Sequence, residues 1–248
     1  MVAMLPSSAT AVINADDPYA PLWQASTAAR VLRFGLSPGA QFRAEGLQLR
    51  LDEQGFATHF RLCSPGGEIA VRLALAGRHN VSNALAAAAA ASAAGATLAD
   101  VRLGLSQMRA VKGRLQLRRR RCGAWLIDDS YNANPSSVRV GLEVLAEMPG
   151  RRWLVLGDMA ELGQFAADSH RELGELARRS GVERLYTYGS LAALAAEGFG
   201  AGAECFVDAG RLRTALEQAL QPDVVLLVKG SRVNRLERLV EALAPEAA

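Results

Sequence analysis

The sequence predicts an α/β fold with two parts, and three patterns support this prediction. From residue 125 onward, short apolar runs alternate with helical patterns, which is typical of a parallel sheet covered by helices on both faces. Residues 41–75 instead alternate polar and apolar side chains between turns, which indicates antiparallel strands. The alanine-rich run 84–94 predicts a helix. We place the domain boundary at Lys112–Arg114, so the predicted domains are 1–112 and 113–248.

Composition limits the classes of function. The chain has 248 residues, enough for one large or two ordinary domains, and half of them are hydrophobic, which argues against global disorder. The formal net charge is +3, and only two of the basic residues are lysines, Lys112 and Lys229. The one dense basic run, residues 118–121, has no interleaved aromatic residues. We therefore expect a solvated edge there and no nucleic-acid partner.

The cysteines and histidines do not form a metal or disulfide pattern. Cys63, Cys122 and Cys205 contain no CxxC pair, and the three histidines contain no HExxH motif, so we expect neither a zinc site nor a disulfide framework. The start of the chain does not read as a signal peptide, and the apolar run 84–94 is too short to span a bilayer. These features favour a cytoplasmic protein without a membrane span.

In the first part, two short strands precede the antiparallel region. Thr10–Ile13 is β-branched and apolar and ends in the acidic turn Asn14–Pro18, and Val31–Phe34 is the second candidate strand. Within residues 41–75, the turn Ser64–Gly67 separates the last two strands. This pattern predicts hairpins at the margin of a sheet.

Two asparagines mark the start of the alanine-rich helix. Asn80 and Asn83 are three residues apart, so their side chains lie on the same face. An amide both donates and accepts hydrogen bonds, which suits the edge of a purine. The alternative is that one asparagine caps the helix while the other faces solvent. A second helix is predicted over Leu98–Met108.

The second part alternates five strands with five helices. The strand candidates are Trp125–Ile127, Trp153–Leu156, Leu185–Tyr188, Cys205–Val207 and Val224–Val228, and the helix candidates are 135–148, 169–180, 191–196, 211–220 and 232–243. Because the strands are almost continuously apolar, we expect a Rossmann-like parallel sheet that is buried on both faces. Asn134 and Pro135 suit the N-cap and the first position of the first of these helices.

Polar clusters follow three of these strands. Asp128 and Asp129 end the first strand, residues 157–163 follow the second, and residues 229–232 follow the last. The carboxyl ends of parallel strands share one edge of a sheet, which is where open α/β sheets bind ligands. We therefore expect a ligand site at this edge, although each cluster alone could be ordinary turn and cap chemistry.

Six motifs occur in one order and carry a family resemblance. They are NADDP at 14–18, GRHNVSNALAAAA at 77–89, KGR at 112–114, DDSYNANPSS at 128–137, LGDMAELG at 156–163 and VKGSR at 228–232. In this set the chain resembles the Mur ligases of peptidoglycan synthesis over essentially its whole length. The YNANP and LGDMAELG stretches resemble the members of the family that add D-alanyl-D-alanine to UDP-N-acetylmuramoyl-tripeptide.

The resemblance implies an ATP- and Mg²⁺-dependent ligase with three domains, of which this chain matches the end of the central domain and the whole C-terminal domain. ATP would phosphorylate the tripeptide carboxylate, and the dipeptide amine would then displace phosphate. The family's P-loop has a glycine before its lysine, but Lys112 follows Val111 and Lys229 follows Val228. We therefore expect the P-loop and the main Mg²⁺ ligands in a missing N-terminal part, and an inactive fragment here.

The resemblance also implies roles for individual residues. The ATP-binding set comprises Asn80 and Asn83 at adenine, Arg114 at the phosphates, Asp129 at the ribose, and nearby His79, Asn14 and Asp16. His79 could equally be a packed histidine without a ligand. The substrate-binding set comprises Tyr131, Asn132, Asn134, Asp158, Lys229, Ser231 and Arg232. Of these, Lys229 and Arg232 are the natural partners for a dipeptide carboxylate. No residue of the chain is assigned a catalytic or metal-binding role.

Other functions stay open on the sequence alone. Without a P-loop, the chain could be a non-catalytic nucleotide- or partner-binding module derived from such a ligase. A related ligase with another acceptor, such as a folate polyglutamate ligase, would share the fold. A nicotinamide dehydrogenase is disfavoured, because no GxGxxG motif follows any of the candidate strands.

Overall fold

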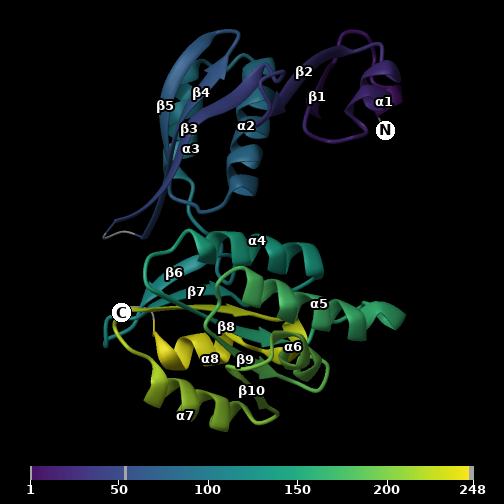
Figure 1. Cartoon of the computed structure of the whole chain (residues 1–248). Helices are drawn as coiled ribbons and strands as arrows, with labels where there is room; N and C mark the ends of the chain where they lie inside the picture. The colour runs from purple at the N-terminus through teal and green to yellow at the C-terminus, as the bar shows by residue number, and fades with distance from the viewer. Residues whose placement is uncertain (1, 53–54, 246–248) are drawn as a thin grey trace. The chain divides into compact units, whose positions relative to one another are not determined.

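The computed structural model describes residues 2–52 and 55–245, which divide into two compact units, Met1–Arg109 (unit 1) and Ala110–Ala248 (unit 2). Unit 1 contains a five-stranded sheet and unit 2 a six-stranded sheet, each covered by helices (Figure 1). Both sheets are mixed and α/β in character, which confirms the predicted fold class. Within the described residues, no helix is long and apolar enough to cross a membrane.

The sheet of unit 1 joins parallel and antiparallel strands. Its order is that of the chain: β1 (Thr10–Asn14), β2 (Arg30–Gly35), β3 (Phe42–Asp52), β4 (Gly55–Ser64) and β5 (Gly67–Leu73). β1, β2 and β3 pair in parallel, whereas β3, β4 and β5 pair as antiparallel hairpins. The hairpins therefore lie at the margin of the sheet, as the alternating pattern predicted.

Helices cover the sheet of unit 1. α2 (Arg78–Ala93) buries Val81 and Leu85 against sheet residues such as Leu62 and Leu73, and α3 (Leu98–Gln107) packs on β5. The small alanines of α2 let the helix lie close to the sheet. A short helix α1 (Ala20–Ala25) and a 3₁₀ turn η1 (Val2–Met4) lie outside the pattern that the sequence predicted.

The sheet of unit 2 has the strand order β10-β9-β8-β11-β7-β6. Its strands are β6 (Gln116–Arg119), β7 (Trp125–Asp129), β8 (Arg151–Gly157), β9 (Arg184–Tyr188), β10 (Ala203–Phe206) and β11 (Val224–Lys229). All neighbours pair in parallel except β6, which is antiparallel to β7. The five predicted parallel strands are therefore confirmed, and β11 lies between β7 and β8.

Helices cover both faces of this sheet (Figure 1). One face carries α4 (Pro135–Ala146), α5 (Ala166–Arg179), which follows the 3₁₀ turn η2 (Gly163–Phe165), and α6 (Ala193–Phe199). The other face carries α7 (Ala209–Ala219) and α8 (Glu237–Leu243), whose leucines pack with Trp153, Tyr186 and Leu226 in one core. Because side chains alternate along a strand, this division of faces decides which strand-end residues can meet.

Two details of unit 2 contradict the sequence predictions. The single helix predicted over residues 232–243 is broken into the 3₁₀ turn η3 (Arg232–Asn234) and α8, with Arg235 between them at φ 51°. The basic run was expected to be a solvated edge, but Arg118 is buried in β6. It pairs there with Glu241 at 2.8 Å and donates to the carbonyl of Ala244. A buried guanidinium is stable only with such partners.

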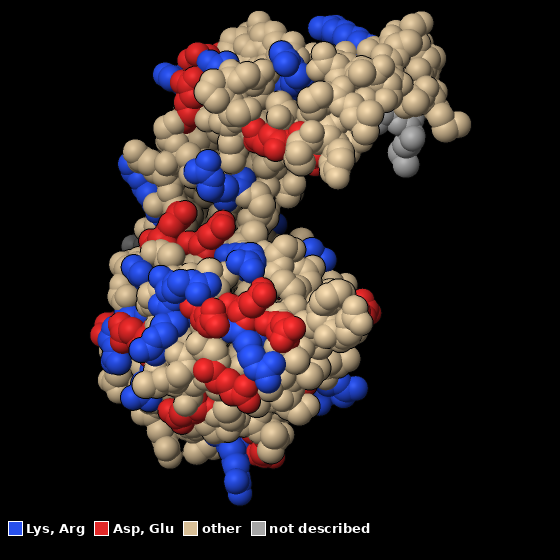
Figure 2. Space-filling model, turned by 45° about the vertical axis from the view of Figure 1, so that its right-hand side comes forward, with Lys and Arg blue, Asp and Glu red and all other residues tan. Residues whose placement is uncertain are grey.

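Charged side chains of both signs share the surface. Figure 2 shows basic and acidic groups intermixed over unit 2 in that view. Exposed ion pairs such as Arg151–Glu183 at 2.9 Å and Arg179–Glu175 at 3.2 Å account for part of this mixture. Exposed pairs of this kind each contribute at most about 1 kcal/mol, so they tune solubility more than they hold the fold.

Candidate functional site

The neighbouring aspartates at the end of β7 point to opposite faces of the sheet. Asp128 faces the α8 side, where its Oδ1 accepts hydrogen bonds from the backbone and hydroxyl of Ser130 and its Oδ2 lies 3.7 Å from Arg118. Asp129 faces the α4 side, where its Oδ1 accepts from the backbone N–H of Leu115 at 3.2 Å. The two carboxylates therefore have separate partners and do not act as a pair.

Asp129 forms a buried ion pair with Lys229 from the neighbouring strand β11. The Lys229 Nζ donates to Asp129 Oδ2 at 2.6 Å and to the carbonyl of Asn132 at 3.0 Å, and only 1% of Lys229 is exposed. Burial raises the pKa of Asp129, and the attraction of Lys229 opposes this shift without cancelling it. Gly141 of α4 lets the helix lie close to β11 beside the pair, because a Cβ there would lie 3.1 Å from Leu227 Cδ2.

Above this pair, Tyr131 lies beside two arginines. The guanidinium carbons of Arg114 and Arg232 lie over its ring, 4.7 Å and 5.2 Å from the ring centroid, within the range of cation–π attraction. Tyr131 is 44% exposed, and neither arginine has a carboxylate partner among the described residues. The three side chains form an exposed, positively charged surface that suits an anion.

A glycine fixes Tyr131 at this position. The backbone N–H of Tyr131 donates to the carbonyl of Gly113 at 3.0 Å. Gly113 has φ 73°, and a Cβ there would lie 3.2 Å from backbone and side-chain atoms of Tyr131. A larger residue would therefore be strained and crowded at this position. The Lys-Gly-Arg turn thus positions both Arg114 and the tyrosine over which Arg114 lies.

Asp158 and Ser231 belong to a second, closed cluster at the same edge. Asp158 Oδ1 accepts from the backbone N–H of Ala192 at 2.6 Å, so its carboxylate holds the turn before α6. The carbonyl of Asp158 accepts from the Ser231 hydroxyl at 2.6 Å and from Asn234 Nδ2 at 2.7 Å, while Asn234 Oδ1 accepts from Asp158 N at 3.1 Å. The polar groups of this cluster are largely satisfied by one another.

This second cluster fills the crevice in which open α/β sheets usually bind ligands. The chain leaves β8 toward the α5 face and leaves β11 toward the α8 face, so the ends of these two adjacent strands form a topological switch point. Asn234 lies directly over Gly157, since a Cβ on that glycine would be 2.8 Å from Asn234 Cγ. A ligand could enter here only after Asn234 moved.

The asparagines of the YNANP motif have local backbone roles. Asn134 is the N-cap of α4, where its Oδ1 accepts from Ser137 N and Ser136 Oγ, both at 2.8 Å, as the sequence predicted for a cap. The side chain of Asn132 accepts from Ala133 N at 2.9 Å, and Asn132 is otherwise exposed. Of the predicted substrate-binding set, Tyr131, Asn132 and Arg232 therefore present their side chains most openly.

In unit 1, the acidic turn after β1 is held by backbone donors. Asp16 accepts from Leu36 N at 2.6 Å and Ser37 N at 3.0 Å, and Asn14 Oδ1 accepts from Asp16 N. Burial acts to raise the pKa of Asp16, but the hydrogen bonds from Leu36 and Ser37, together with the charge of Arg78, hold it below its ordinary value. α2 packs against β1, the strand that this turn follows.

The first two turns of α2 carry the other three predicted nucleotide residues. Gly77 is the N-cap, with φ 91° and no side-chain cap bond, so neither asparagine caps this helix. Asn80 Nδ2 donates to the carbonyl of Ala76 at 2.7 Å, whereas Asn83 is exposed and His79 is half-buried. In unit 1, all five predicted nucleotide residues thus lie at the end of β1 or the start of α2.

Several residues of these clusters were missed by the sequence analysis. Asn234 and Arg118 carry structural hydrogen bonds and ion pairs, but neither belongs to a motif that marks it. Gly113 had a signal, because a glycine in a basic turn before a strand is a common left-handed position. Across residues 2–52 and 55–245, no group of three or more His, Cys, Asp or Glu side chains could hold a metal ion.

Two family models match the chain. The Mur ligase middle domain matches residues 1–91, and the Mur ligase glutamate ligase domain matches residues 113–232. The UDP-N-acetylmuramoyl-tripeptide–D-alanyl-D-alanine ligase of Escherichia coli K12 is 40% identical over 96% of this chain and 53% of its own length. The enzyme of the same name from Mycobacterium bovis is 36% identical over 98% of this chain and 52% of its own length.

Solved structures agree with these relatives. A crystal structure of MurF from Acinetobacter baumannii superposes with a TM-score of 0.85 at 31% identity, over 96% of this chain and 52% of that one. MurF from Thermotoga maritima, solved in complex with ADP, shares the fold with a TM-score of 0.81 at 24% identity, over 96% of this chain and 53% of that one. The chain spans about half the length of the curated relatives it matches. It belongs to the Mur ligase family.

Proposed function

We propose that this chain supplies the adenine-side segment and the acceptor domain of an ATP-dependent ligase. The ligase joins D-alanyl-D-alanine to UDP-N-acetylmuramoyl-tripeptide in the cytoplasm, as a step of peptidoglycan and cell wall synthesis. The observation that carries the proposal is 40% identity to the Escherichia coli enzyme of that name over 96% of the chain. The phosphate-binding half of the site would be contributed by an N-terminal part like that of the relatives.

The residues of the chain fit a nucleotide in several respects. Arg114 is exposed and has no carboxylate partner among the described residues, so its guanidinium can donate hydrogen bonds to a phosphate. In the other unit, Asn83 is exposed on the second turn of α2 and suits a purine edge. Asp129 is oriented by Leu115 and Lys229, so a ribose hydroxyl would have to share its oxygens. ATP with Mg²⁺, when bound, supplies the phosphoryl group that activates the tripeptide carboxylate.

For the acceptor dipeptide, we assign different roles to the two basic residues Arg232 and Lys229. Arg232 is exposed and lies beside Tyr131, so it is the partner that a dipeptide carboxylate could reach. Lys229 is buried against Asp129 and the carbonyl of Asn132, so we assign it a positioning role. It holds the start of the YNANP loop against the sheet. Acyl transfer of this kind needs positioned charges more than a protein nucleophile.

The test is a phosphate-release assay with a divided enzyme. The chain is incubated with ATP, Mg²⁺, UDP-N-acetylmuramoyl-tripeptide and D-alanyl-D-alanine, with and without the N-terminal half of the Escherichia coli relative. We expect release only from the combined halves, and only with D-alanyl-D-alanine, not with D-glutamate or L-alanine. Release with those amino acids would refute the acceptor assignment. Turnover by the chain alone would refute the assignment of phosphate binding to another segment.

The alternative function is a non-catalytic binding module. It is favoured by one observation, which is that no glycine precedes either lysine, so the sequence contains no Gly-Lys-Ser/Thr phosphate loop. If the combined halves form a complex by size-exclusion chromatography yet release no phosphate, the module is the better description. In that case ADP titrated into the chain should bind without any effect of the dipeptide.

A further inference from the structure

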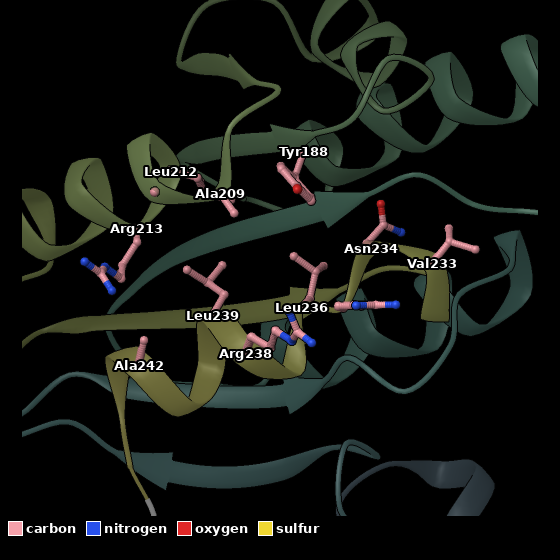
Figure 3. A pocket seen from close by; sticks show the side chains of 12 residues that line it. Tyr188, Ala209, Leu212, Arg213, Val233, Asn234, Leu236, Arg238, Leu239 and Ala242 are labelled. Carbon is pink, nitrogen blue, oxygen red and sulfur yellow. The ribbon is translucent and has the colours of Figure 1, made fainter.

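A pocket on the α7–α8 face of unit 2 lies outside the predicted ligase site. It has a volume of about 330 Å³ and opens between the first turns of α7, the end of β9 and the η3–α8 segment. Figure 3 shows Leu236 and Leu239 between Tyr188 on one side and Arg238 on the other. The pocket lies within unit 2 alone. Its volume falls in the range of small-molecule sites, roughly 300–1,000 Å³.

The pocket is basic without compensating acids. Arg213, Arg235 and Arg238 line it, and none of its lining residues is acidic. Arg235 and Arg238 have no carboxylate partner among the described residues, while Arg213 contacts Glu217 at 3.6 Å along its own helix. The nearby carboxylate of Asp208 already accepts from the N–H of Arg211 at 2.8 Å as the cap of α7. The pocket therefore keeps an excess of positive charge.

The floor of the pocket is apolar. Leu212, Leu236 and Leu239 belong to the core that joins α7 and α8 to the sheet, and they are at most 7% exposed. The half-buried ring of Tyr188 forms one side. The small residues Ala209, Gly210 and Ala242 leave the space above this floor open. An apolar floor with arginines beside it favours a ligand that is anionic at one end and apolar at the other.

We propose that this pocket binds an organic phosphate whose phosphate group is attached to an aromatic or apolar body. Guanidinium groups bind phosphate oxygens bidentately, and several together favour a dianion over a single carboxylate. The body of the ligand packs on Leu236 and Leu239 against the Tyr188 ring. The pocket differs from the Tyr131 surface, since none of Tyr131, Arg114 and Arg232 lines it.

The proposal is tested by calorimetric titration of the full chain with phenyl phosphate, inorganic phosphate and phenol. We expect phenyl phosphate to bind most tightly, because it alone offers both the anion and the apolar body. The double variant Arg235→Ala/Arg238→Ala should raise its Kd by about tenfold or more. Ala242→Phe, which fills the apolar space and keeps the arginines, should weaken phenyl phosphate but leave inorganic phosphate unchanged.

The matched control removes two exposed arginines elsewhere in unit 2. Arg139→Ala/Arg179→Ala changes the net charge by the same amount on α4 and α5. Equal loss of affinity in this control would overturn the site in favour of general electrostatic attraction. Equal affinity for phenyl phosphate and inorganic phosphate would overturn the apolar part of the proposal. Absence of saturable binding to the unmodified chain would overturn all of it.

Discussion

Two neighbouring stretches of one sheet edge differ in what they leave exposed. At the ends of β7 and β11, the buried Lys229–Asp129 pair lies under an exposed Tyr131 with two arginines over its ring. At the ends of β8 and β11, Asp158, Ser231 and Asn234 hydrogen-bond to each other and fill the crevice. The first stretch offers unpaired positive charge to a ligand, whereas the second offers almost none.

The difference shows that position at a strand end does not make a polar residue a ligand contact. Both stretches follow buried parallel strands and both are rich in Asp, Ser, Asn and basic residues. What separates them is whether the polar atoms find partners within the protein. At the first stretch, Lys229 and Asp129 pair with each other below the surface, while Arg114 and Arg232 lie over the Tyr131 ring without a carboxylate partner among the described residues. At the second stretch, the side chains of Ser231 and Asn234 form hydrogen bonds to the backbone of Asp158.

The largest expected effect comes from breaking the buried pair. Lys229→Met should leave the Asp129 carboxylate buried without its cation, which costs about 3–5 kcal/mol of unfolding free energy. The measurement is chemical denaturation of the full chain, followed by circular dichroism. If the loss stays near that of an exposed substitution, the pair does not support the Tyr131 surface.

A double variant separates the charge from the packing at this pair. Asp129→Asn/Lys229→Met removes both charges and should recover most of the stability lost in Lys229→Met, because replacing a whole buried pair is often close to neutral. A double variant as unstable as Lys229→Met would mean that shape, not unpaired charge, causes the loss.

The next largest effect is expected from opening the crevice that Asp158, Ser231 and Asn234 fill. Asn234→Ala removes the side chain that accepts from Asp158 N and donates to the carbonyl of Asp158. We expect a loss of about 1–3 kcal/mol, since each of these two hydrogen bonds contributes about 0.5–1.5 kcal/mol, and the Asp158 backbone keeps only its bonds to Tyr188 and Ser231. Gly157→Ala should be destabilising alone, because its Cβ would meet Asn234, and much less so in the Asn234→Ala background. Additive losses in this double-mutant cycle would show that Asn234 does not fill the crevice.

The fold was predictable where local patterns and burial agree. Apolar runs such as Val224–Val228 and turn signals such as Ser64–Gly67 carry their own structural information. The short helix α1 was missed because its six residues have no side-chain cap and little periodicity. The break in the last helix was missed because it depends on Asn234 bonding to a loop 76 residues away.

The sequence predicted which residues lie at the candidate site, but not which of them are buried or bonded to one another. Motif order drew attention to Lys229, Asp158 and Ser231, yet a sequence does not show which polar groups bond to one another. The burial of Lys229 follows from β11 lying between β7 and β8, and that order is set by tertiary packing. The same reasoning explains the burial of Arg118. Its place in a run of four arginines suggested solvated charge, but its partner Glu241 lies 123 residues away in the sequence.

A smaller effect concerns pH and follows from the raised pKa of Asp129. A carboxyl whose pKa is higher in the folded than in the unfolded chain binds protons more readily when folded, so its contribution to stability falls as pH rises from the unfolded value through the folded one. Relative to Asp129→Asn/Lys229→Met, the natural chain should therefore lose stability across that range. The measurement is denaturation of both proteins at a series of pH values. A parallel pH dependence would contradict the prediction.

The smallest effect on stability is expected at Tyr131. This residue also gives the most direct test of whether the first stretch is a prepared anion site. Tyr131→Phe keeps the ring, so the side-chain NMR resonances of Arg114 and Arg232 should retain their ring-current shifts. Tyr131→Ala should abolish these shifts and should destabilise the chain by only about 0.5–1 kcal/mol in total, the range of cation–π attraction at an exposed site. If Tyr131→Ala leaves both resonances unchanged, the ring does not hold the arginines. The exposed stretch would then be ordinary surface charge, because an anion site needs guanidinium groups that are held in place before the ligand arrives.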